Sequence, residues 1–216
     1  MTEWSDERLR AALRLYLLAD TGLVPAERLP EAVAAAIRGG VRSVQLRAKG
    51  ATTLQHLELA RALLDVCRAA GVPLIVNDRV DIALAAGADG AHVGHIGDED
   101  LTPQDARRLL GPGAIVGVSV GSPQEARLAA AAGASYVSAG PMFTTTTKPN
   151  AGPAAGAPLL RGVRNATRLA VVAIGGIRAD RAPALYAAGA DGVCVGAAIL
   201  KSPDPESAAR AFREPV

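Results

Sequence analysis

The sequence predicts an α/β chain of alternating strands and helices that closes into a (β/α)8 TIM barrel. The clearest sign is the phrase Ala-Ala-Gly-Ala, which occurs three times, starting at Ala85, Ala131 and Ala187, each time before a short apolar segment closed by glycine. Glycine just past a helix tolerates the left-handed turn that ends it, and the apolar residues after it indicate a strand buried on both faces. Half of the 216 residues are hydrophobic, enough for one sizeable core.

The first half of the chain predicts four strands, each followed by a helix. Apolar residues recur at helical spacing in these helices, as Val33 and Ile37 do in the first and Ala60 and Leu64 in the second. In chain order we expect strand Leu15–Ala19, helix Glu27–Arg38, strand Ser43–Arg47, helix Leu54–Ala69, strand Pro73–Val76, helix Val80–Ala86, strand Ala91–Gly94 and helix Pro103–Leu110.

The second half continues the alternation. Thr102 and Ser122 each precede a proline in the first turn of a helix and predict N-caps. The elements are strand Ile115–Ser119, helix Pro123–Ala132, strand Tyr136–Ala139, helix Leu159–Thr167, strand Ala170–Ile174, helix Ala179–Ala188, strand Gly192–Val195 and helix Pro205–Arg213. We expect residues 1–216 to form a single barrel domain, with a phosphate-binding site at the C-terminal ends of the strands.

Composition argues against several kinds of partner. The net charge is +2, and no segment combines basic and aromatic residues as a nucleic-acid surface does. The longest apolar stretch, Leu169–Ile177, is too short to span a membrane, and the charged first ten residues do not resemble an export signal. Cys67 and Cys194 fall in a predicted helix and strand and indicate two interior thiols. A cytoplasmic enzyme acting on small molecules, without a nucleic-acid or membrane partner, is expected; the oligomeric state is left open.

Polar residues gather where predicted strands end. Gln45, Arg47 and Lys49 alternate along the end of the second strand, so their side chains leave it on one side, towards the barrel mouth. Two cations at this rim indicate an anionic ligand. The alternative is that Arg47 and Lys49 are solvated loop charges.

Acidic residues follow the next two strands. Asn77 and Asp78 end the third strand, and Asp98, Glu99 and Asp100 come after the fourth. Magnesium prefers oxygen ligands and often needs only one or two carboxylates beside substrate phosphates. Helix capping is the alternative role for Asp78, and a solvated loop or a cap is the alternative for the Asp98–Asp100 cluster.

Two further features suit phosphate groups. The segment Gly140–Ala157 is much longer than a connection requires, and four threonines in it precede Lys148, which suggests a binding loop, with simple flexibility as the alternative. The seventh and eighth strands end in Gly175-Gly176 and Gly196-Ala197, where backbone amides can approach a phosphate without a side chain between them. Each glycine taken alone could be only a turn.

At this point the sequence resembles the thiamine phosphate synthase family over essentially its whole length. The motifs that carry the resemblance are Gln45-Leu46-Arg47-Ala48-Lys49, Val76 through Asp81, Gly117-Val118-Ser119, Gly140-Pro141 through Thr145-x-Thr147-Lys148, and Ile174-Gly175-Gly176-Ile177. The resemblance implies a Mg²⁺-dependent transferase that joins a hydroxymethylpyrimidine diphosphate to a thiazole phosphate. The products are thiamine monophosphate and diphosphate.

The resemblance also implies a role for each matching residue. Arg47, Lys49 and Lys148 would be catalytic, and Asp78 and Asp100 would hold magnesium. The residues that would bind the two substrates are Gln45, Leu46, Arg47, Ala48, Lys49, Asn77, Ser119, Thr145, Thr146, Thr147, Lys148, Gly176, Gly196 and Ala197.

The sequence departs from the family pattern at three places. Four residues, His95 through Asp98, separate Gly94 from Glu99, where the family usually has one, commonly Gln, so Asp98 competes with Asp100 as a metal ligand. Ala197 replaces a common serine, and Gly121 stands where many relatives have histidine. The missing histidine argues against the main alternative, a thiazole tautomerase on the same fold. A non-catalytic thiazole phosphate-binding barrel is a second alternative, disfavoured by the intact diphosphate and metal residues.

The three histidines are expected to have structural roles. His56 is expected to face solvent on its helix, and His92 lies within the fourth strand. His95 falls in the altered loop near the presumed metal, where contact with substrate is an alternative.

Overall fold

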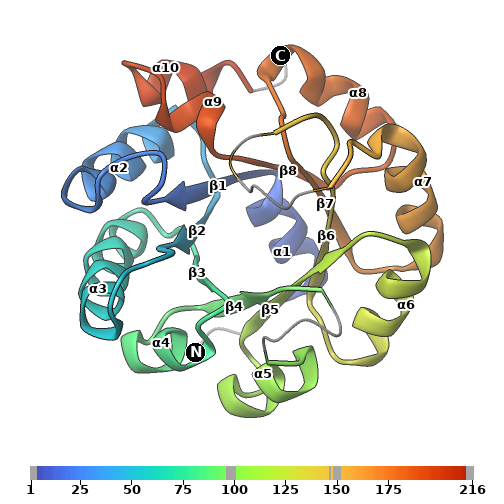
Figure 1. Cartoon of the computed structure of the whole chain (residues 1–216), viewed down its shortest axis with the longest axis horizontal. Helices are drawn as coiled ribbons and strands as arrows, with labels where there is room; N and C mark the ends of the chain where they lie inside the picture. The colour runs from blue at the N-terminus through green and yellow to red at the C-terminus, as the bar shows by residue number, and fades with distance from the viewer. Residues whose placement is uncertain (1–3, 96–100, 146, 148–151, 213–216) are drawn as a thin grey trace.

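The computed structural model is a closed barrel of eight parallel strands surrounded by helices (Figure 1). It describes residues 4–95, 101–145, 147 and 152–212. Each strand pairs in parallel with the next one in sequence, and β8 pairs with β1, which confirms the predicted fold. The strands are β1 Leu15–Asp20, β2 Ser43–Arg47, β3 Leu74–Asn77, β4 Gly90–Val93, β5 Ile115–Val120, β6 Tyr136–Ala139, β7 Ala170–Ile174 and β8 Gly192–Val195.

The helices form a ring outside the strands, and none in the described part of the chain is long and apolar enough to cross a lipid bilayer. Thr102 and Ser122 cap their helices as predicted, accepting hydrogen bonds from the amides of Asp105 and Glu125. The helices of the ring are α2 Leu29–Gly39, α3 Thr53–Ala69, α4 Val80–Ala86, α5 Pro103–Leu110, α6 Pro123–Ala131, α7 Gly156–Ala166, α8 Ala182–Ala187, α9 Ala197–Leu200 and α10 Pro205–Arg210. Short 3-10 turns, Ala26–Arg28 and Ala179–Arg181, lead into α2 and α8.

An additional helix, α1 (Asp6–Leu13), was not predicted. Figure 1 shows it behind the centre of the barrel, where it closes the end at which the strands begin. Ser5 caps it, and Leu9 and Leu13, four residues apart, are buried against the barrel interior. Four charged residues, Asp6, Glu7, Arg8 and Arg10, lie around these leucines and leave only a narrow apolar stripe, which is why the sequence suggested no element here.

The repeated Ala-Ala-Gly-Ala phrase ties neighbouring strands together at their starts. The residue after each copy uses its side chain to accept a hydrogen bond from the amide at the start of the preceding strand, and its own amide donates to the carbonyl of that same residue. The pairs are Asp89 with Leu74, Ser135 with Val116 and Asp191 with Val171, with side-chain bonds of 2.9, 3.1 and 2.8 Å. The side chain thus satisfies an amide that the ladder leaves unpaired.

An arginine from a preceding helix contacts each of these turns. Arg68 of α3 donates to the carbonyl of Gly87, Arg107 of α5 donates to the carbonyl of Gly133, and Arg164 of α7 donates to the carboxylate of Asp191. The glycines of the three copies have φ angles of 72°, 84° and 104°, the left-handed conformation predicted for them. The repeat therefore serves as a structural joint at the floor of the barrel, opposite the rim where strands end.

Both cysteines and His56 are buried in the barrel. Cys67 and Cys194 are buried free thiols, as predicted, and burial raises the pKa of the Cys67 thiol to about 12. His56 is also buried, so the expectation that it faces solvent is wrong. It lies on the inward stripe of α3 with Ala60, Leu63 and Cys67, and burial lowers its pKa. The spacing of the apolar residues predicted this stripe, but His56 was not assigned to it because it is polar and lies before the first of them.

The joint predicts a specific loss of stability. Ser135→Ala removes the acceptor of the Val116 amide and one partner of Arg107, and should lower the free energy of unfolding by about 1–3 kcal/mol. Chemical denaturation measures this change. Ser202→Ala is the matched control, because its hydroxyl bonds only to the backbone of Asp204 at an exposed turn. Equal losses in the two variants would contradict the role of the joint.

Candidate functional site

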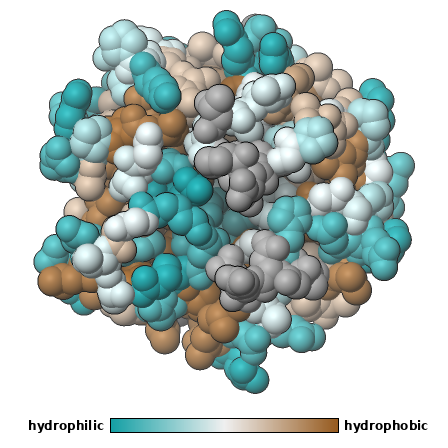
Figure 2. All heavy atoms as spheres, viewed as in Figure 1, coloured by the Kyte–Doolittle hydropathy of each residue, from teal (hydrophilic) through white to brown (hydrophobic). Residues whose placement is uncertain are grey.

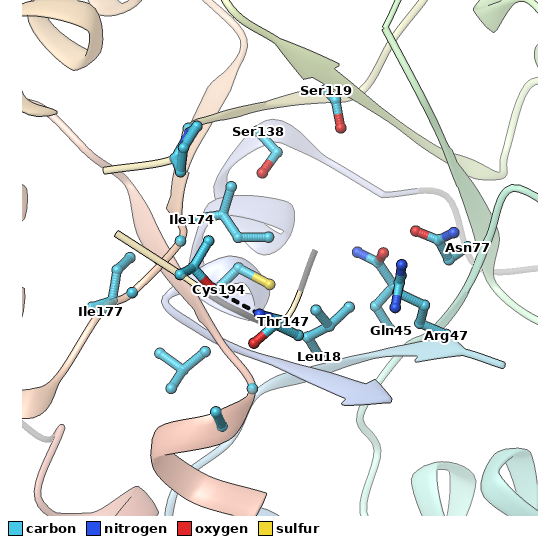
Figure 3. A pocket seen from close by; sticks show the side chains of 18 of the residues that line it. Leu18, Gln45, Arg47, Asn77, Ser119, Ser138, Thr147, Ile174, Ile177 and Cys194 are labelled. Carbon is cyan, nitrogen blue, oxygen red and sulfur yellow. Dashed lines mark hydrogen bonds between the residues drawn. The ribbon is translucent and has the colours of Figure 1, made fainter. Parts of the chain in front are cut away.

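A cavity of about 1110 Å³ opens at the carboxyl ends of the strands. Figure 2 shows hydrophilic residues gathered over the centre of this face, and Figure 3 shows side chains from several strands pointing into the cavity. Most residues predicted to form the site line it, although they come from distant parts of the sequence. These are Gln45, Arg47, Lys49, Asn77, Asp78, Ser119, Thr145, Thr147, Gly176, Gly196 and Ala197.

The remaining predicted residues divide into two groups. The side chains of Leu46 and Ala48 do not reach the cavity: they belong to the core between strands and helices, because successive residues of a strand point to opposite faces. Their predicted contact with substrate therefore stays a prediction, and it would involve backbone atoms rather than side chains. Thr146, Lys148, Asp98 and Asp100 lie outside the described residues.

Arg47 is held in place by a carboxylate that the sequence analysis missed. Its Nη1 lies 2.6 Å from Oδ2 of Asp20, the last residue of β1, whose side chain is 2% exposed. The other oxygen of Asp20 accepts a hydrogen bond from the amide of Gly22. Guanidinium carries five N–H donors, so this ion pair fixes the orientation of Arg47 and leaves donors for an anion in the cavity. The sequence did contain a sign of this role, because Asp20 directly follows the predicted strand Leu15–Ala19, as the other predicted rim residues follow theirs.

Lys49 and Asp78 form a second ion pair at the rim, with Nζ 2.6 Å from Oδ2. The backbone of Asp78 is left-handed, with a φ of 62°, which aspartate tolerates better than most residues. No side-chain cap is seen at the start of α4, so the capping alternative for Asp78 is not supported. The side chain of Lys49 is 62% exposed, so it can move towards a ligand. If an anion and a cation bound together, Lys49 could pair with the anion and Asp78 with the cation.

The donor set near Asp78 suits a hard cation that retains other ligands. Within residues 4–95, 101–145, 147 and 152–212, no three histidine, cysteine or acidic side chains are grouped closely enough to hold a metal alone. Asp78 and the neighbouring amide of Asn77 offer oxygen atoms at the cavity wall. Magnesium needs few protein carboxylates where phosphate oxygens complete its coordination, so these residues fit it.

The loops after β6 and β7 are fitted closely to each other. The amides of Met142 and Phe143 donate to the carbonyls of Ile174 and Gly175, at 2.8 and 3.0 Å. A Cβ atom on Gly176, whose φ is 63°, would lie 2.4 Å from the carbonyl oxygen of Thr144. Glycine at this position is therefore required by the packing of the threonine loop, in addition to the predicted access of its amide to a phosphate.

Beneath the cavity, five polar side chains form a continuous hydrogen-bonded chain across the barrel. Gln45 Nε2 donates to Tyr16 Oη at 2.8 Å, and the hydroxyls of Tyr16 and Tyr136 lie 2.8 Å apart. His92 joins Tyr136 through Nδ1 at 2.9 Å and Ser119 through Nε2 at 3.0 Å. Both ends of this chain, Gln45 and Ser119, line the cavity (Figure 3), and so does His92. The sequence analysis identified the two ends but not the tyrosines, which lie inside strands where they read as core.

His95 lies beside Gly121 at the cavity wall. A Cβ atom at Gly121 would lie 3.5 Å from His95 Cε1, and His95 lines the cavity. Its Nδ1 is 2.8 Å from Oε2 of Glu125, which also accepts from the amide of Gly121 and through Oε1 from the hydroxyl of Ser122. Burial acts to raise the pKa of Glu125, but these hydrogen bonds outweigh it and the pKa is lowered. A histidine thus stands beside position 121 after all, supplied by the loop after β4.

Arg178 is another lining residue that the sequence analysis missed. It follows Gly176 and Ile177 at the end of β7 and adds a cation on the side of the cavity opposite β2 and β3. It is exposed, and its Nε lies 3.5 Å from a carboxylate oxygen of Asp180. An arginine in a loop gives little signal by itself, because most such residues are solvated.

Comparison with known proteins gives consistent results. A family model described as thiamine monophosphate synthase matches residues 15–199. The thiamine-phosphate synthase of Roseiflexus castenholzii is 46% identical over 198 residues, covering 92% of this chain and 86% of that protein. The thiamine-phosphate synthase of Moorella thermoacetica is 45% identical, covering 94% and 95%.

A solved structure agrees with these sequence matches. The thiamine phosphate pyrophosphorylase of Pyrococcus furiosus superposes with a TM-score of 0.84 at 35% sequence identity, covering 94% of this chain and 95% of that one. The superposition therefore covers nearly the whole of both chains.

The lowered pKa of Glu125 predicts a pH-dependent contribution to stability. A carboxyl with a folded pKa below its ordinary value of 4.5 stabilises the fold above that pH, and this stabilisation is lost as the pH falls through the folded pKa. The difference in melting temperature between the native chain and Glu125→Gln should therefore be larger at pH 7 than at about pH 3. Differential scanning calorimetry at both pH values measures it, with Glu31→Gln on exposed α2 surface as control. A difference independent of pH would contradict the assignment.

Proposed function

The chain belongs to the thiamine monophosphate synthase family and is a transferase of thiamine biosynthesis, and from that premise we propose how its cavity carries out the reaction. The substrates are 4-amino-2-methyl-5-hydroxymethylpyrimidine diphosphate and a thiazole phosphate, and the products are thiamine monophosphate and diphosphate. The observation that carries the proposal is the placement of Arg47, Lys49 and Asp78 at one side of the cavity and Gly176 and Gly196 at the other. Two phosphorylated substrates require two such subsites facing each other.

The pyrimidine diphosphate binds at the ends of β2 and β3. Arg47, oriented by Asp20, offers its remaining N–H groups to the diphosphate, and Lys49 and Asn77 add a point charge and an amide donor. Gln45 and Ser119 face the pyrimidine ring deeper in the cavity. Because Arg47 is already fixed before the ligand arrives, little conformational entropy is lost on binding.

Magnesium would be held by Asp78 together with Asp100 or Asp98, and the substrate diphosphate would complete its coordination. When bound, the ion supplies positive charge that offsets the charge developing on the departing diphosphate. Asp78 supports this role because its carboxylate faces the cavity and caps no helix. The exposed Lys49 is then released to the diphosphate.

The thiazole phosphate binds on the opposite side, at the ends of β7 and β8. The backbone amides of Gly176, Gly196 and Ala197 approach its phosphate, and Arg178 lies close enough to the cavity to add charge. Ala197 contributes no hydroxyl, so this subsite depends on backbone donors. Thr145, Thr147 and Lys148 of the loop after β6 contact both substrates and cover them.

The chemical step needs no general base. The bond between the pyrimidine methylene carbon and the diphosphate oxygen breaks with its electron pair going to diphosphate, and the thiazole nitrogen donates its lone pair to the methylene carbon. Arg47, Lys49 and Lys148 stabilise the departing anion electrostatically without moving a proton. The electron-rich aminopyrimidine stabilises the cation formed between these two events, and the two subsites hold the rings in line.

One observation keeps a proton-shifting activity, as in a thiazole tautomerase, as the second candidate. The His95–Glu125 pair at the cavity wall is an arrangement that can move a proton. The charged residues at β2 and β3 favour the transferase, because an isomerase acting on the thiazole alone has no diphosphate to bind. We expect the enzyme to act in the cytoplasm, where Cys67 and Cys194 remain reduced.

The direct test combines both substrates with the purified protein. With magnesium we expect diphosphate release and a product with the mass of thiamine monophosphate, and with EDTA we expect neither. Lys148→Ala should lower turnover about a hundredfold, the usual effect of removing one preorganised electrostatic donor. Lys201→Ala, an exposed lysine just after α9, is the matched control. Unchanged turnover in Lys148→Ala would remove this lysine from the mechanism, and isomerised thiazole as the sole product would establish the second candidate.

Asp78→Asn tests the metal site. If Asp78 binds magnesium, the concentration of magnesium needed for half-maximal activity should rise at least about tenfold, because a charged ligand becomes neutral. Titration of activity with magnesium measures this value. Asp98→Asn and Asp100→Asn, compared in the same titration, identify the second ligand as the one whose loss raises the requirement. A lower melting temperature with unchanged metal dependence in Asp78→Asn would contradict the assignment.

A further inference from the structure

The hydrogen-bonded chain from Gln45 to Ser119 runs through side chains that are almost completely buried in the barrel. Tyr16 and Tyr136 are 1% and 0% exposed and His92 is 5% exposed. Gly117 on β5 makes room for the ring of Tyr136, since a Cβ atom there would lie 2.2 Å from Tyr136 Cζ. Buried polar groups are costly unless each donor meets an acceptor, so the position of every hydrogen in this chain is constrained by its neighbours.

The amide of Gln45 determines the direction of the first two bonds. Its Nε2 donates to Tyr16 Oη, so the hydroxyl hydrogen of Tyr16 must point elsewhere. In the described part of the chain, the remaining partner of this hydroxyl is Tyr136. Burial, followed by the proximity of Tyr136, raises the pKa of Tyr16, and burial raises that of Tyr136. Both hydroxyls therefore keep their single hydrogen, and Tyr16 donates to Tyr136.

The same logic assigns the hydrogens of the last two bonds. Tyr136 cannot place its hydrogen in the gap already occupied by that of Tyr16, so it donates to His92 Nδ1. Nδ1 is then an acceptor, which puts the hydrogen of neutral His92 on Nε2, from which it donates to Ser119 Oγ. The hydroxyl hydrogen of Ser119 is left for the cavity. At the other end, Gln45 Oε1 has no hydrogen-bond partner among the described residues and is an acceptor at the cavity wall.

We propose that Tyr16, Tyr136 and His92 are positioning residues that act as one directional hydrogen-bonded chain, holding Gln45 as an acceptor and Ser119 as a donor so that the cavity selects an aminopyrimidine over its oxo counterpart. The proposal rests on the proposed function only for the identity of the ring. The two ends are coupled, because reversing the Gln45 amide would reverse every bond and make Ser119 an acceptor.

The chemistry of the two rings explains the selectivity. An aminopyrimidine carries an exocyclic N–H donor and a ring nitrogen with a lone pair, which would match an acceptor at Gln45 and a donor at Ser119. Replacing the amino group by oxygen puts an acceptor opposite the Gln45 oxygen. A site that leaves buried polar groups unpaired with the wrong ligand discriminates strongly against it, much more than an apolar wall does.

The first test uses the native sequence and needs no activity. Nitrogen-15 NMR of histidine-labelled protein, with His92 assigned by comparison with His56→Gln and His95→Gln, reports which ring nitrogen carries the hydrogen. We expect the hydrogen of neutral His92 on Nε2 and none on Nδ1. A hydrogen on Nδ1, or a mixture of the two tautomers, would overturn the proposed direction.

The second test measures selectivity in Tyr136→Phe, which removes the middle hydroxyl. The ratio of kcat/KM for the aminopyrimidine diphosphate to that for the 4-oxo analogue should fall about tenfold or more, while the KM for thiazole phosphate stays unchanged. Tyr186→Phe is the matched control, because its hydroxyl bonds to the carbonyl of Arg14 outside the cavity. An unchanged ratio in Tyr136→Phe would show that the chain is structural only and would overturn the proposal.

Misfolding of a variant and failure of the proposed function can each be told apart from failure of the proposed chain. If Tyr136→Phe does not fold, Tyr16→Phe breaks the same chain one bond earlier, and the same fall in selectivity is expected. If the native protein forms no thiamine monophosphate, the proposed function fails while the tautomer of His92 still tests the chain. Binding of the two pyrimidine diphosphates, measured by calorimetry, then replaces kcat/KM, and equal affinities would overturn the proposal.

Discussion

Parallel closure of the barrel decides where every other feature of the molecule lies. All eight strands run in the same direction and β8 pairs with β1, so the carboxyl end of every strand reaches one rim. Residues separated by more than a hundred positions, such as Arg47 and Gly176, thereby face one cavity. The opposite end is closed by α1 and by the joints at Asp89, Ser135 and Asp191, which leaves the rim free to vary.

Two cations in the described part of the rim form ion pairs with carboxylates. Arg47 is fixed by the buried Asp20, whereas Lys49 meets Asp78 at an exposed position. The two pairs differ in mobility because desolvation and hydrogen bonding hold a buried pair in one geometry, while solvent screens an exposed one. This difference suits a site in which one cation must orient an anion and another must change partners.

The interior of the barrel combines an apolar core with a polar chain that crosses it. Ile75, Ile115 and Val172 surround Tyr16 and Tyr136, whose rings meet nearly edge to face at 79°. Such a chain costs more than an apolar filling unless it is fully paired, and the pairing observed here ends at two groups, Gln45 and Ser119, that line the cavity. We infer that the barrel bears this cost for selectivity.

Local signals in the sequence were enough to predict the fold and many of the residues that line the cavity. Glycine after most helices and apolar runs of strand length are such signals, and alternation along the end of β2 correctly directed Gln45, Arg47 and Lys49 to one side. The partners of these residues became visible in the folded barrel: Asp20 holds Arg47, His95 stands beside Gly121, and two core tyrosines with His92 join Gln45 to Ser119. These contacts depend on which side chains face each other across a closed barrel, and spacing along one strand carries no information about the residue opposite. Leu46 and Ala48 show the same limit, since a motif includes neighbours in sequence that the strand sends to its other face.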